Sequence, residues 1–167
     1  MKKIGLLSDT HGFLDPNFFD LFSGCDEIWH AGDIGAVSVS EQLENFKPFR
    51  AVYGNIDGTE MRARFPEKNI FLCEKVKVFI IHIGGYPGNY FPGIKEQLTE
   101  QKPDLFICGH SHILKIMRDE KYHLLHMNPG AAGKHGMHKI RTAIRFSIDE
   151  KKIKDVEVIE LGARGKI

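Results

Sequence analysis

Hydrophobic and polar positions along the first two thirds of the chain indicate buried strands that alternate with helices. Short apolar runs that end in polar residues or glycine are typical of buried parallel strands. Such runs occupy residues 3–8, 27–33, 49–55, 76–82 and 103–109, and a further strand is expected at 69–73. The first three runs and the segments between them therefore predict a βαβαβ unit.

Helices are expected in the segments that separate these strands. Asp15 and Pro16 are the residue types of a helix N-cap and a first helical position, and aromatic and leucine side chains follow them before Gly24. Residues 40–46 and 94–101 are expected to form two further helices.

Beyond residue 110 apolar and polar residues alternate, which predicts half-buried strands and hairpins. These strands are expected at residues 113–119, 122–128, 142–148 and 154–161, with a hairpin turn at 149–152. No repeat or linker interrupts the sequence, so we expect a single α/β domain over residues 1–167, with a mixed sheet or two packed sheets. The basic residues 163–167 are expected to form a disordered tail.

Composition narrows the classes of partner. The chain is 42% hydrophobic and carries 23 Lys and Arg against 22 Asp and Glu, with the two signs interspersed. This balance argues against stable nucleic-acid binding or a membrane surface and favours a small substrate. The cysteines Cys25, Cys73 and Cys108 are odd in number and widely spaced, as expected of free thiols. Without a signal peptide or a membrane-length apolar segment, the cytoplasm is the expected location.

Polar side chains follow five of the predicted strands at the point where each ends. Open α/β sheets place their binding sites at the carboxyl ends of strands, so these side chains are candidates for one site. His110 and His112 also have the spacing that directs both rings to the same side of an extended segment. The candidate residues are Asp9, His11, Asp33, Asn55, Asp57, His82, His110 and His112.

Carboxylate, amide and imidazole groups without thiolates are a donor set that suits Mn, Fe, Zn, Co or Ni. Some members of the set also fit ordinary loops, since Asp33 and the segment 55–58 have the composition of turns. Turn chemistry does not require two histidines one residue apart at 110 and 112, nor a histidine or carboxylate at every strand end. The pattern therefore favours a metal site.

The ordered set of motifs resembles the calcineurin-like metallophosphoesterase superfamily. The motifs that carry the resemblance are Asp9-x-His11, Gly32-Asp33, Gly54-Asn55-x-Asp57, His82 and Gly109-His110-Ser111-His112. The compact length and the turn Asn128-Pro129-Gly130 further resemble its small bacterial and archaeal phosphodiesterase branch. The resemblance spans residues 4–132 and implies an α/β fold in which two mixed β-sheets pack face to face as a sandwich flanked by helices, a four-layer αββα arrangement.

The resemblance also implies a dinuclear metal centre with assigned ligands. Asp9, His11 and His112 would hold the first ion, Asn55, His82 and His110 the second, and Asp33 would bridge both. The implied cofactors are two divalent metal ions, Mn first, with Ni, Fe, Zn or Co as alternatives. Asp33, Asn55 and His82 would also act in catalysis, with the Asn55 NH2 group available to a phosphate oxygen.

The activity implied is that of a phosphodiesterase, which hydrolyses a phosphate ester by in-line attack of a metal-bridging hydroxide. Small members of the family often form dimers or larger assemblies, so a homo-oligomer is expected. The alternatives are a non-catalytic protein-interaction scaffold of the same fold, as in a retromer subunit that this chain also resembles, and a metal or nucleotide sensor.

The chain departs from the family pattern at two positions. Ile56 stands where many relatives carry a histidine that serves as general acid, and His82-Ile83-Gly84 replaces the usual His-Gly-His. The first change removes a residue that could protonate a poor leaving group, and the second removes a candidate substrate-contacting imidazole. We therefore expect activity on phosphodiesters or activated esters rather than on unactivated monoesters.

Other conspicuous residues have competing interpretations. His30 is expected to be a satisfied core histidine rather than a residue that orients a ligand, and His123 and His126 are expected to be hairpin positions. The loop residues Tyr86, Asn89, Tyr90 and Phe91 could cap the site and stack on an aryl group or serve in packing. A solvated loop is the expected role of Lys134, His135 and His138.

Overall fold

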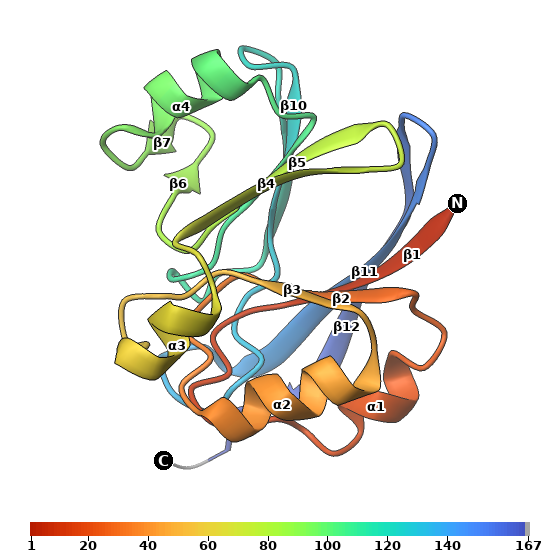
Figure 1. Cartoon of the computed structure of the whole chain (residues 1–167), viewed down its shortest axis with the longest axis vertical. Helices are drawn as coiled ribbons and strands as arrows, with labels where there is room; N and C mark the ends of the chain where they lie inside the picture. The colour runs from red at the N-terminus through yellow and green to blue at the C-terminus, as the bar shows by residue number, and fades with distance from the viewer. Residues whose placement is uncertain (166–167) are drawn as a thin grey trace.

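Two five-stranded mixed sheets face each other in the computed structural model, which describes residues 1–165 (Figure 1). The first sheet has the order β12 (Lys152–Ala163), β11 (Ile140–Asp149), β1 (Lys2–Leu7), β2 (Glu27–His30) and β3 (Phe49–Ala51). The second has the order β4 (Lys68–Cys73), β5 (Val76–Ile81), β8 (Leu105–Ile107), β10 (Leu124–Asn128) and β9 (Lys115–Asp119). A small antiparallel pair, β6 (Gly85–Tyr86) and β7 (Asn89–Tyr90), lies in the loop after β5.

Each sheet combines a parallel centre with antiparallel edges. Strands β1, β2 and β3 run parallel, as do β5, β8 and β10, whereas β11, β12, β4 and β9 pair antiparallel with their neighbours. The parallel strands require crossover connections, which run through helices between β1 and β8 and through β9 between β8 and β10. The carboxyl ends of β1, β2 and β3 therefore meet at one edge of the molecule, away from the N-terminus in Figure 1.

The alternation of side chains along each strand builds the layers. Ile4 and Leu6 of β1 and Trp29 of β2 lie in the core between the two sheets, where Trp29 packs edge-on against Phe71 and Phe146. Leu7 and Ile28 face the opposite side, in a second cluster under the helices. Because neighbouring residues on a strand point to opposite faces, short apolar runs fill both layers of core.

Helices cover the outer faces of both sheets. The helices α1 (Phe18–Leu21), α2 (Val37–Phe46) and α3 (Thr59–Arg64) contribute Phe18, Leu43 and Met61 to the cluster on the first sheet. The helix α4 (Ile94–Gln101) packs Ile94 and Leu98 on the second sheet (Figure 1). The predicted four-layer αββα sandwich is thus confirmed.

Three local expectations need correction. The helix expected after Pro16 is only the single turn α1, although the Asp15 carboxylate accepts the Asn17 N–H at 2.8 Å as a cap does, and it also forms a buried ion pair with Arg141. Helix α3 was not expected, since Met61 is its one buried residue and gives no periodic pattern. The tail prediction is wrong for Arg164, whose guanidinium donates to the Gly136 carbonyl at 2.7 Å, and residues 166–167 lie outside the described residues.

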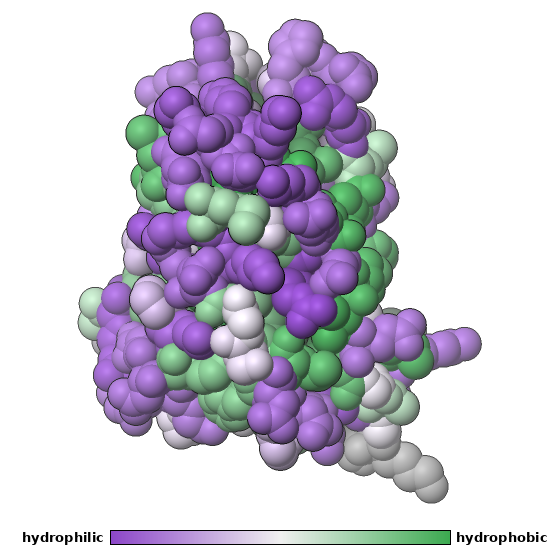
Figure 2. Space-filling model, turned by 90° about the vertical axis from the view of Figure 1, so that its right-hand side faces the viewer, coloured by the Kyte–Doolittle hydropathy of each residue, from purple (hydrophilic) through white to green (hydrophobic). Residues whose placement is uncertain are grey.

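The cysteines are free and buried, as expected, and burial raises the pKa of all three thiols. Among residues 1–165, no helix is both long enough and apolar enough to cross a membrane. Figure 2 shows one face of the molecule, on which hydrophilic side chains cover most of the surface and apolar ones gather in a band along its right-hand side.

Candidate metal centre

Two groups of three side chains converge at the edge where the parallel strands end. Asp9, His11 and His112 form one group, and Asp33, His82 and His110 form the other. Within each group the potential ligand atoms lie within 4.8 Å of one another. The residues come from the loops after β1, β2, β5 and β8, as the sequence predicts.

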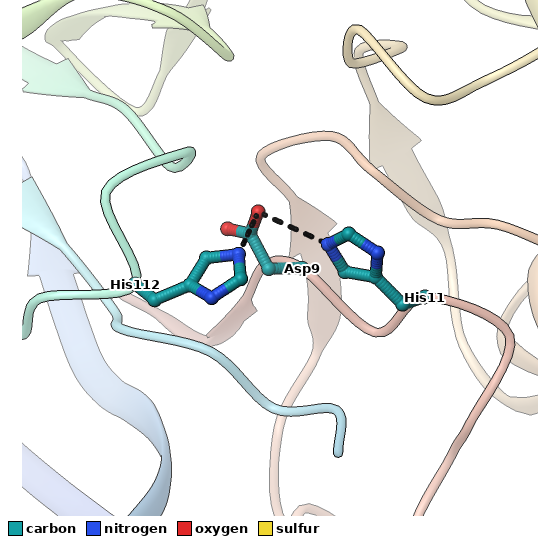
Figure 3. A group of neighbouring side chains, drawn as sticks. All are labelled: Asp9, His11 and His112. Atoms are coloured by element: carbon teal, nitrogen blue, oxygen red, sulfur yellow. Dashed lines mark ion pairs between the residues drawn. The ribbon is translucent and has the colours of Figure 1, made fainter. Parts of the chain in front are cut away.

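Asp9 lies between the two histidines of the first group (Figure 3). Its Oδ1 atom is 3.1 Å from Nε2 of His112 and 3.8 Å from Nε2 of His11. Its Oδ2 atom instead accepts the Ser8 hydroxyl at 2.6 Å and the backbone N–H of His110 at 3.1 Å. Burial alone would raise the pKa of Asp9, but its interactions with His11 and His112 hold it well below the usual range. One oxygen is thus fixed by the protein and the other faces the histidines.

Asp33 connects the two groups. Its Oδ2 atom lies 3.5 Å from Nε2 of His11 and 3.2 Å from Nε2 of His82. Its Oδ1 atom accepts the backbone N–H of Ile56 at 3.0 Å, which fixes the orientation of the carboxylate. Although burial raises its pKa, the side chain of His82 and the Ile56 N–H lower it overall. The carboxylate therefore stays ionised at neutral pH, between the two histidine sets.

Buried polar atoms without partners mark the centre of this arrangement. Nε2 of His11, Nε2 of His82 and Oδ1 of Asp9 are buried, and no hydrogen-bond partner for them occurs among residues 1–165. Nδ1 of His82 lies 2.8 Å from the carbonyl oxygen of Ala31, so the ring donates there and leaves Nε2 as an acceptor. Buried polar atoms are normally satisfied, and these unsatisfied acceptors fit coordination of a cation.

Asn55 completes the set of predicted residues. Its Oδ1 atom is 3.0 Å from Nδ1 of His110, and both side chains are exposed at the same edge. The structure therefore brings together every residue predicted to be a ligand: Asp9, His11, Asp33, Asn55, His82, His110 and His112.

Asp57 has a different role from these residues. Its carboxylate accepts backbone N–H groups of Gly54 at 2.8 Å, Gly35 at 2.8 Å and Ile34 at 3.1 Å. These bonds join the loop after β2 to the loop after β3 and place Asp33 beside Asn55. The turn interpretation thus applies to Asp57, which positions two loops.

The backbone at the site is unusual. Five of the predicted ligands have left-handed φ angles, at 54° for Asp9, 46° for His11, 55° for Asp33, 69° for His110 and 60° for His112. Residues other than glycine rarely adopt the left-handed region of backbone conformation, and such conformations concentrate at functional sites. His110 and His112 therefore do not lie in the extended segment assumed from their spacing, and they reach the site through left-handed turns, each in a different ligand group.

His30 lies beneath the site as a satisfied core histidine, as expected. Its Nδ1 atom accepts the backbone N–H of Gly32 at 3.1 Å, so its Nε2–H points to the Thr10 hydroxyl at 3.0 Å. That hydroxyl donates in turn to the Ile34 carbonyl at 2.8 Å. Burial lowers the pKa of His30 to about 4 and keeps it neutral. The neutral ring connects the loops that carry Asp9 and Asp33.

Some side chains of the loop after β5 pack against the protein, and others are exposed. Tyr90 is a packing residue, because its ring contacts Phe106 and Tyr122 and its hydroxyl donates to Asp119. Phe91 is 53% exposed and lines a pocket of about 310 Å³ that also includes Asn55 and His82. The expectation of a cap over the site therefore fits Phe91 and does not fit Tyr90.

The segment 133–139 contributes two histidines that the sequence reasoning did not place at the site. The ring of His135 stacks on that of His11 with centroids 4.9 Å apart. The ring of His138 packs edge-on against that of His112 at 5.3 Å, and its Nε2–H donates to the Gly133 carbonyl at 2.8 Å. The solvated-loop prediction fits His135, which is exposed although it stacks on His11, and does not fit the half-buried His138. No pattern in the sequence marks these two histidines, because their position depends on how the chain folds back after Asn128, whose amide donates to the Gly109 carbonyl.

Comparison with known proteins finds similarity both in sequence and in fold. Residues 1–151 match the calcineurin-like phosphoesterase superfamily domain. A probable metallophosphoesterase of Methanothermobacter thermautotrophicus is 30% identical over 165 residues, which cover 96% of this chain and 93% of that protein. The solved structure of an archaeal phosphodiesterase superposes with a TM-score of 0.73 at 24% identity, covering 94% of this chain and 99% of its own. Zinc-bound Vps29 from Entamoeba histolytica has a TM-score of 0.72 at 14% identity, covering 96% and 99%.

Proposed function

Because the chain belongs to the calcineurin-like phosphoesterase superfamily, we propose that it is a phosphodiesterase that uses two divalent metal ions. The observation that carries the proposal is the carboxylate of Asp33, which faces histidines of both ligand groups, at 3.5 Å from His11 and 3.2 Å from His82. A shared carboxylate is the feature that couples two neighbouring metal positions.

The residues present fit two ions in number and in chemistry. Asp9, His11 and His112 would hold the first ion, Asn55, His82 and His110 the second, and Asp33 would bridge them. The unsatisfied buried acceptors of Asp9, His11 and His82 support this assignment. Mixed oxygen and imidazole donors suit Mn²⁺, our first choice, and also Ni, Fe, Zn or Co.

Two divalent ions held here would supply a nucleophile at neutral pH and offset the negative charge of a phosphoryl group. The protein's own contribution is to hold the donors in place before substrate arrives, through Ser8 and His110 on Asp9 and through Ile56 on Asp33. Asn55 is exposed at the same edge, where its NH2 group can donate to a phosphoryl oxygen.

The side chain at position 56 favours esters whose leaving group needs no protonation. Ile56 is 47% exposed beside Asp33 and offers the substrate no proton, although its backbone N–H is used to orient the carboxylate. A leaving group that departs without protonation is therefore favoured, such as the aryl group of an activated diester. Ile83 likewise provides no donor after His82.

The decisive experiment compares bis(p-nitrophenyl) phosphate with p-nitrophenyl phosphate, using metal-stripped protein reloaded with Mn²⁺ or Ni²⁺. We expect metal-dependent turnover that is faster on the diester, together with two bound ions per chain by elemental analysis. The matched control is Asp33→Asn, which should lose both turnover and metal. Faster hydrolysis of the monoester would contradict the diester preference, and one ion per chain would contradict the dinuclear centre.

A non-catalytic scaffold is the second candidate, and it is the fold similarity to Vps29 that favours it. All seven proposed ligand positions carry competent donors in this chain, which favours the enzyme. Purified protein that binds no metal and hydrolyses neither ester would support the scaffold instead.

A further inference from the structure

A small cavity lies beside the proposed metal centre, between the loop that contains β6 and the strands β9 and β10. Its volume is about 130 Å³, and Tyr86, Ser111, Lys115 and His126 line it. Tyr86 and Ser111 also line a neighbouring hollow of about 300 Å³ that includes His110. A molecule bound at the metal centre could therefore extend through the hollow into the cavity.

His126 is the least expected residue of this cavity. Its side chain is 0% exposed, and within the part of the chain that the structure describes neither ring nitrogen makes a hydrogen bond of full geometry, the Phe106 backbone being its nearest partner. Burial lowers its pKa to about 4, so at neutral pH the ring is uncharged and carries one N–H to donate. Buried polar side chains are nearly always satisfied, so an imidazole without a full hydrogen bond at a cavity points to a ligand.

Lys115 supplies a positive charge at the same place. Its ammonium nitrogen lies 4.2 Å from the centroid of the Tyr86 ring, and no carboxylate among residues 1–165 forms an ion pair with it. Contact with an aromatic face leaves its N–H groups free to donate to an anion. The Tyr86 ring thereby holds the ammonium group without satisfying it.

The other polar groups near the cavity add hydrogen-bond donors rather than acceptors. The Ser111 hydroxyl oxygen accepts the Ile113 N–H at 3.2 Å and the Asn128 amide at 3.1 Å, so its own O–H is free to donate. Asp119 is the acidic group that acts on His126, but its carboxylate already accepts the Tyr90 hydroxyl and the Lys121 N–H. Lys115 and Ser111 thus offer donors for which the described residues provide no acceptor, and the Phe106 backbone is the nearest acceptor for the His126 ring.

We propose that this cavity binds a terminal carboxylate or phosphate on one ester arm of the substrate, through Lys115, Ser111 and His126. This inference rests on the proposed phosphodiesterase function and narrows it to diesters that carry a second anionic group. The hollow that contains His110 would hold the part of the arm between the two charges. An uncharged end would leave the ammonium and imidazole groups unsatisfied, which disfavours neutral substrates.

The first test uses three p-nitrophenyl phosphodiesters that share a leaving group and differ only at the end of the second arm. The arms end in a carboxylate, a phosphate or an uncharged carboxamide. We expect a KM about tenfold lower for a charged arm than for the carboxamide, with similar kcat. The larger effect of the two charged arms identifies the preferred anion. Equal KM values for all three would overturn the proposal.

The variant that tests the subsite is Lys115→Met, which keeps an apolar stem on Tyr86 and removes the charge. It should abolish the advantage of the charged arms and leave the carboxamide diester unaffected. The matched control is Lys121→Met, because the Lys121 ammonium also lies over a tyrosine ring, 5.6 Å from that of Tyr122, but does not line this cavity. A charge preference that survives Lys115→Met would contradict the assignment.

A second measurement separates failure of the subsite from failure of the proposed function. Metal-stripped protein is titrated with acetate and with inorganic phosphate while the ring resonances of His126 are followed by NMR. A saturable shift that Lys115→Met eliminates supports the subsite even if no ester is hydrolysed. Metal-dependent diester hydrolysis without such a shift, and without a charge preference, would refute the subsite and leave the phosphodiesterase proposal intact.

Discussion

The imidazole of His135 stacks on the imidazole of His11, with ring centroids 4.9 Å apart and planes 24° from parallel. His11 is a proposed ligand, whereas His135 is exposed on the segment 133–139. The contact restricts the orientation of the His11 ring. A side chain outside the ligand set thereby supports one of its members.

Replacing His135 should weaken the first metal position selectively. Aromatic pairs contribute about 0.5–1.5 kcal/mol, so His135→Ala is expected to reduce affinity for the first ion by about two- to tenfold. His135→Phe keeps a stacked ring and should restore most of the affinity. Stepwise metal titration followed by calorimetry measures both. If Phe behaves like Ala, the imidazole acts by a route other than stacking.

The sequence predicted the proposed ligands better than it predicted the residues that contact and position them. Asp9, His11, Asp33, Asn55, His82, His110 and His112 share one physical signal, a polar residue at the end of an apolar run. The structure brings them together, and their role as ligands stays a prediction. His135 and His138 carry no such signal, because their position depends on how the chain folds back after Asn128.

Local patterns failed where tertiary contacts decide the conformation. Asp15 has the sequence of a helix cap and its carboxylate also pairs with the remote Arg141, yet the helix that follows, α1, has only four residues. Asp33 and Asp57 have similar turn-like surroundings in sequence, yet one faces histidines and the other accepts three backbone N–H groups. Only the distance between loops that are remote in sequence distinguishes these two carboxylates.

Asp57 should contribute to stability as well as to the site. Its carboxylate accepts N–H groups from Gly54, Gly35 and Ile34, and hydrogen bonds to a charged acceptor contribute about 1.5–3 kcal/mol. Asp57→Asn turns one acceptor oxygen into a donor that faces a backbone N–H. We expect the free energy of unfolding of the metal-free protein to fall by about 2 kcal/mol in urea titrations. An unchanged midpoint would show that the loops hold together without this carboxylate.

The buried neutral histidines predict a pH-dependent stability. His30 and His126 have pKa values lowered by burial to about 4, against about 6.5 for an unfolded chain. The unfolded state therefore binds more protons between these values, so the stability is fully present above pH 6.5 and is lost as pH falls toward 4.

The variant His126→Phe isolates one of these contributions. It should flatten the decline of the free energy of unfolding between pH 6.5 and 4 by up to about 3 kcal/mol. Urea unfolding of metal-free protein at four pH values in this window measures the effect. A decline as steep as that of the unaltered protein would show that His126 is not buried in neutral form.

Phe91 should select aryl groups if the proposed function holds. It is 53% exposed and lines the pocket of about 310 Å³ next to Asn55 and His82. Stacking on an aryl arm contributes about 1 kcal/mol, so Phe91→Ala should raise KM for bis(p-nitrophenyl) phosphate about fivefold with little change in kcat. The matched control Leu72→Ala removes a side chain that is 67% exposed and does not line this pocket. An equal rise in KM for a dialkyl ester would argue against stacking.

Replacing Gly54 tests whether the position of Asp33 is essential for metal binding. A Cβ atom added at Gly54 would overlap Oδ1 and the backbone nitrogen of Asp33 and lie 2.8 Å from its Cγ. Because a backbone atom cannot move aside as a flexible side chain can, Gly54→Ala should displace the carboxylate that faces both ligand groups. We expect both ions to bind at least tenfold more weakly and diester turnover to fall with them. Gly58→Ala is the matched control, since Gly58 lies four residues away with negative φ and no atom within 4 Å of the added Cβ. Far-ultraviolet circular dichroism checks that both variants fold, and unaltered metal binding in folded Gly54→Ala would show that Asp33 does not bridge two ions.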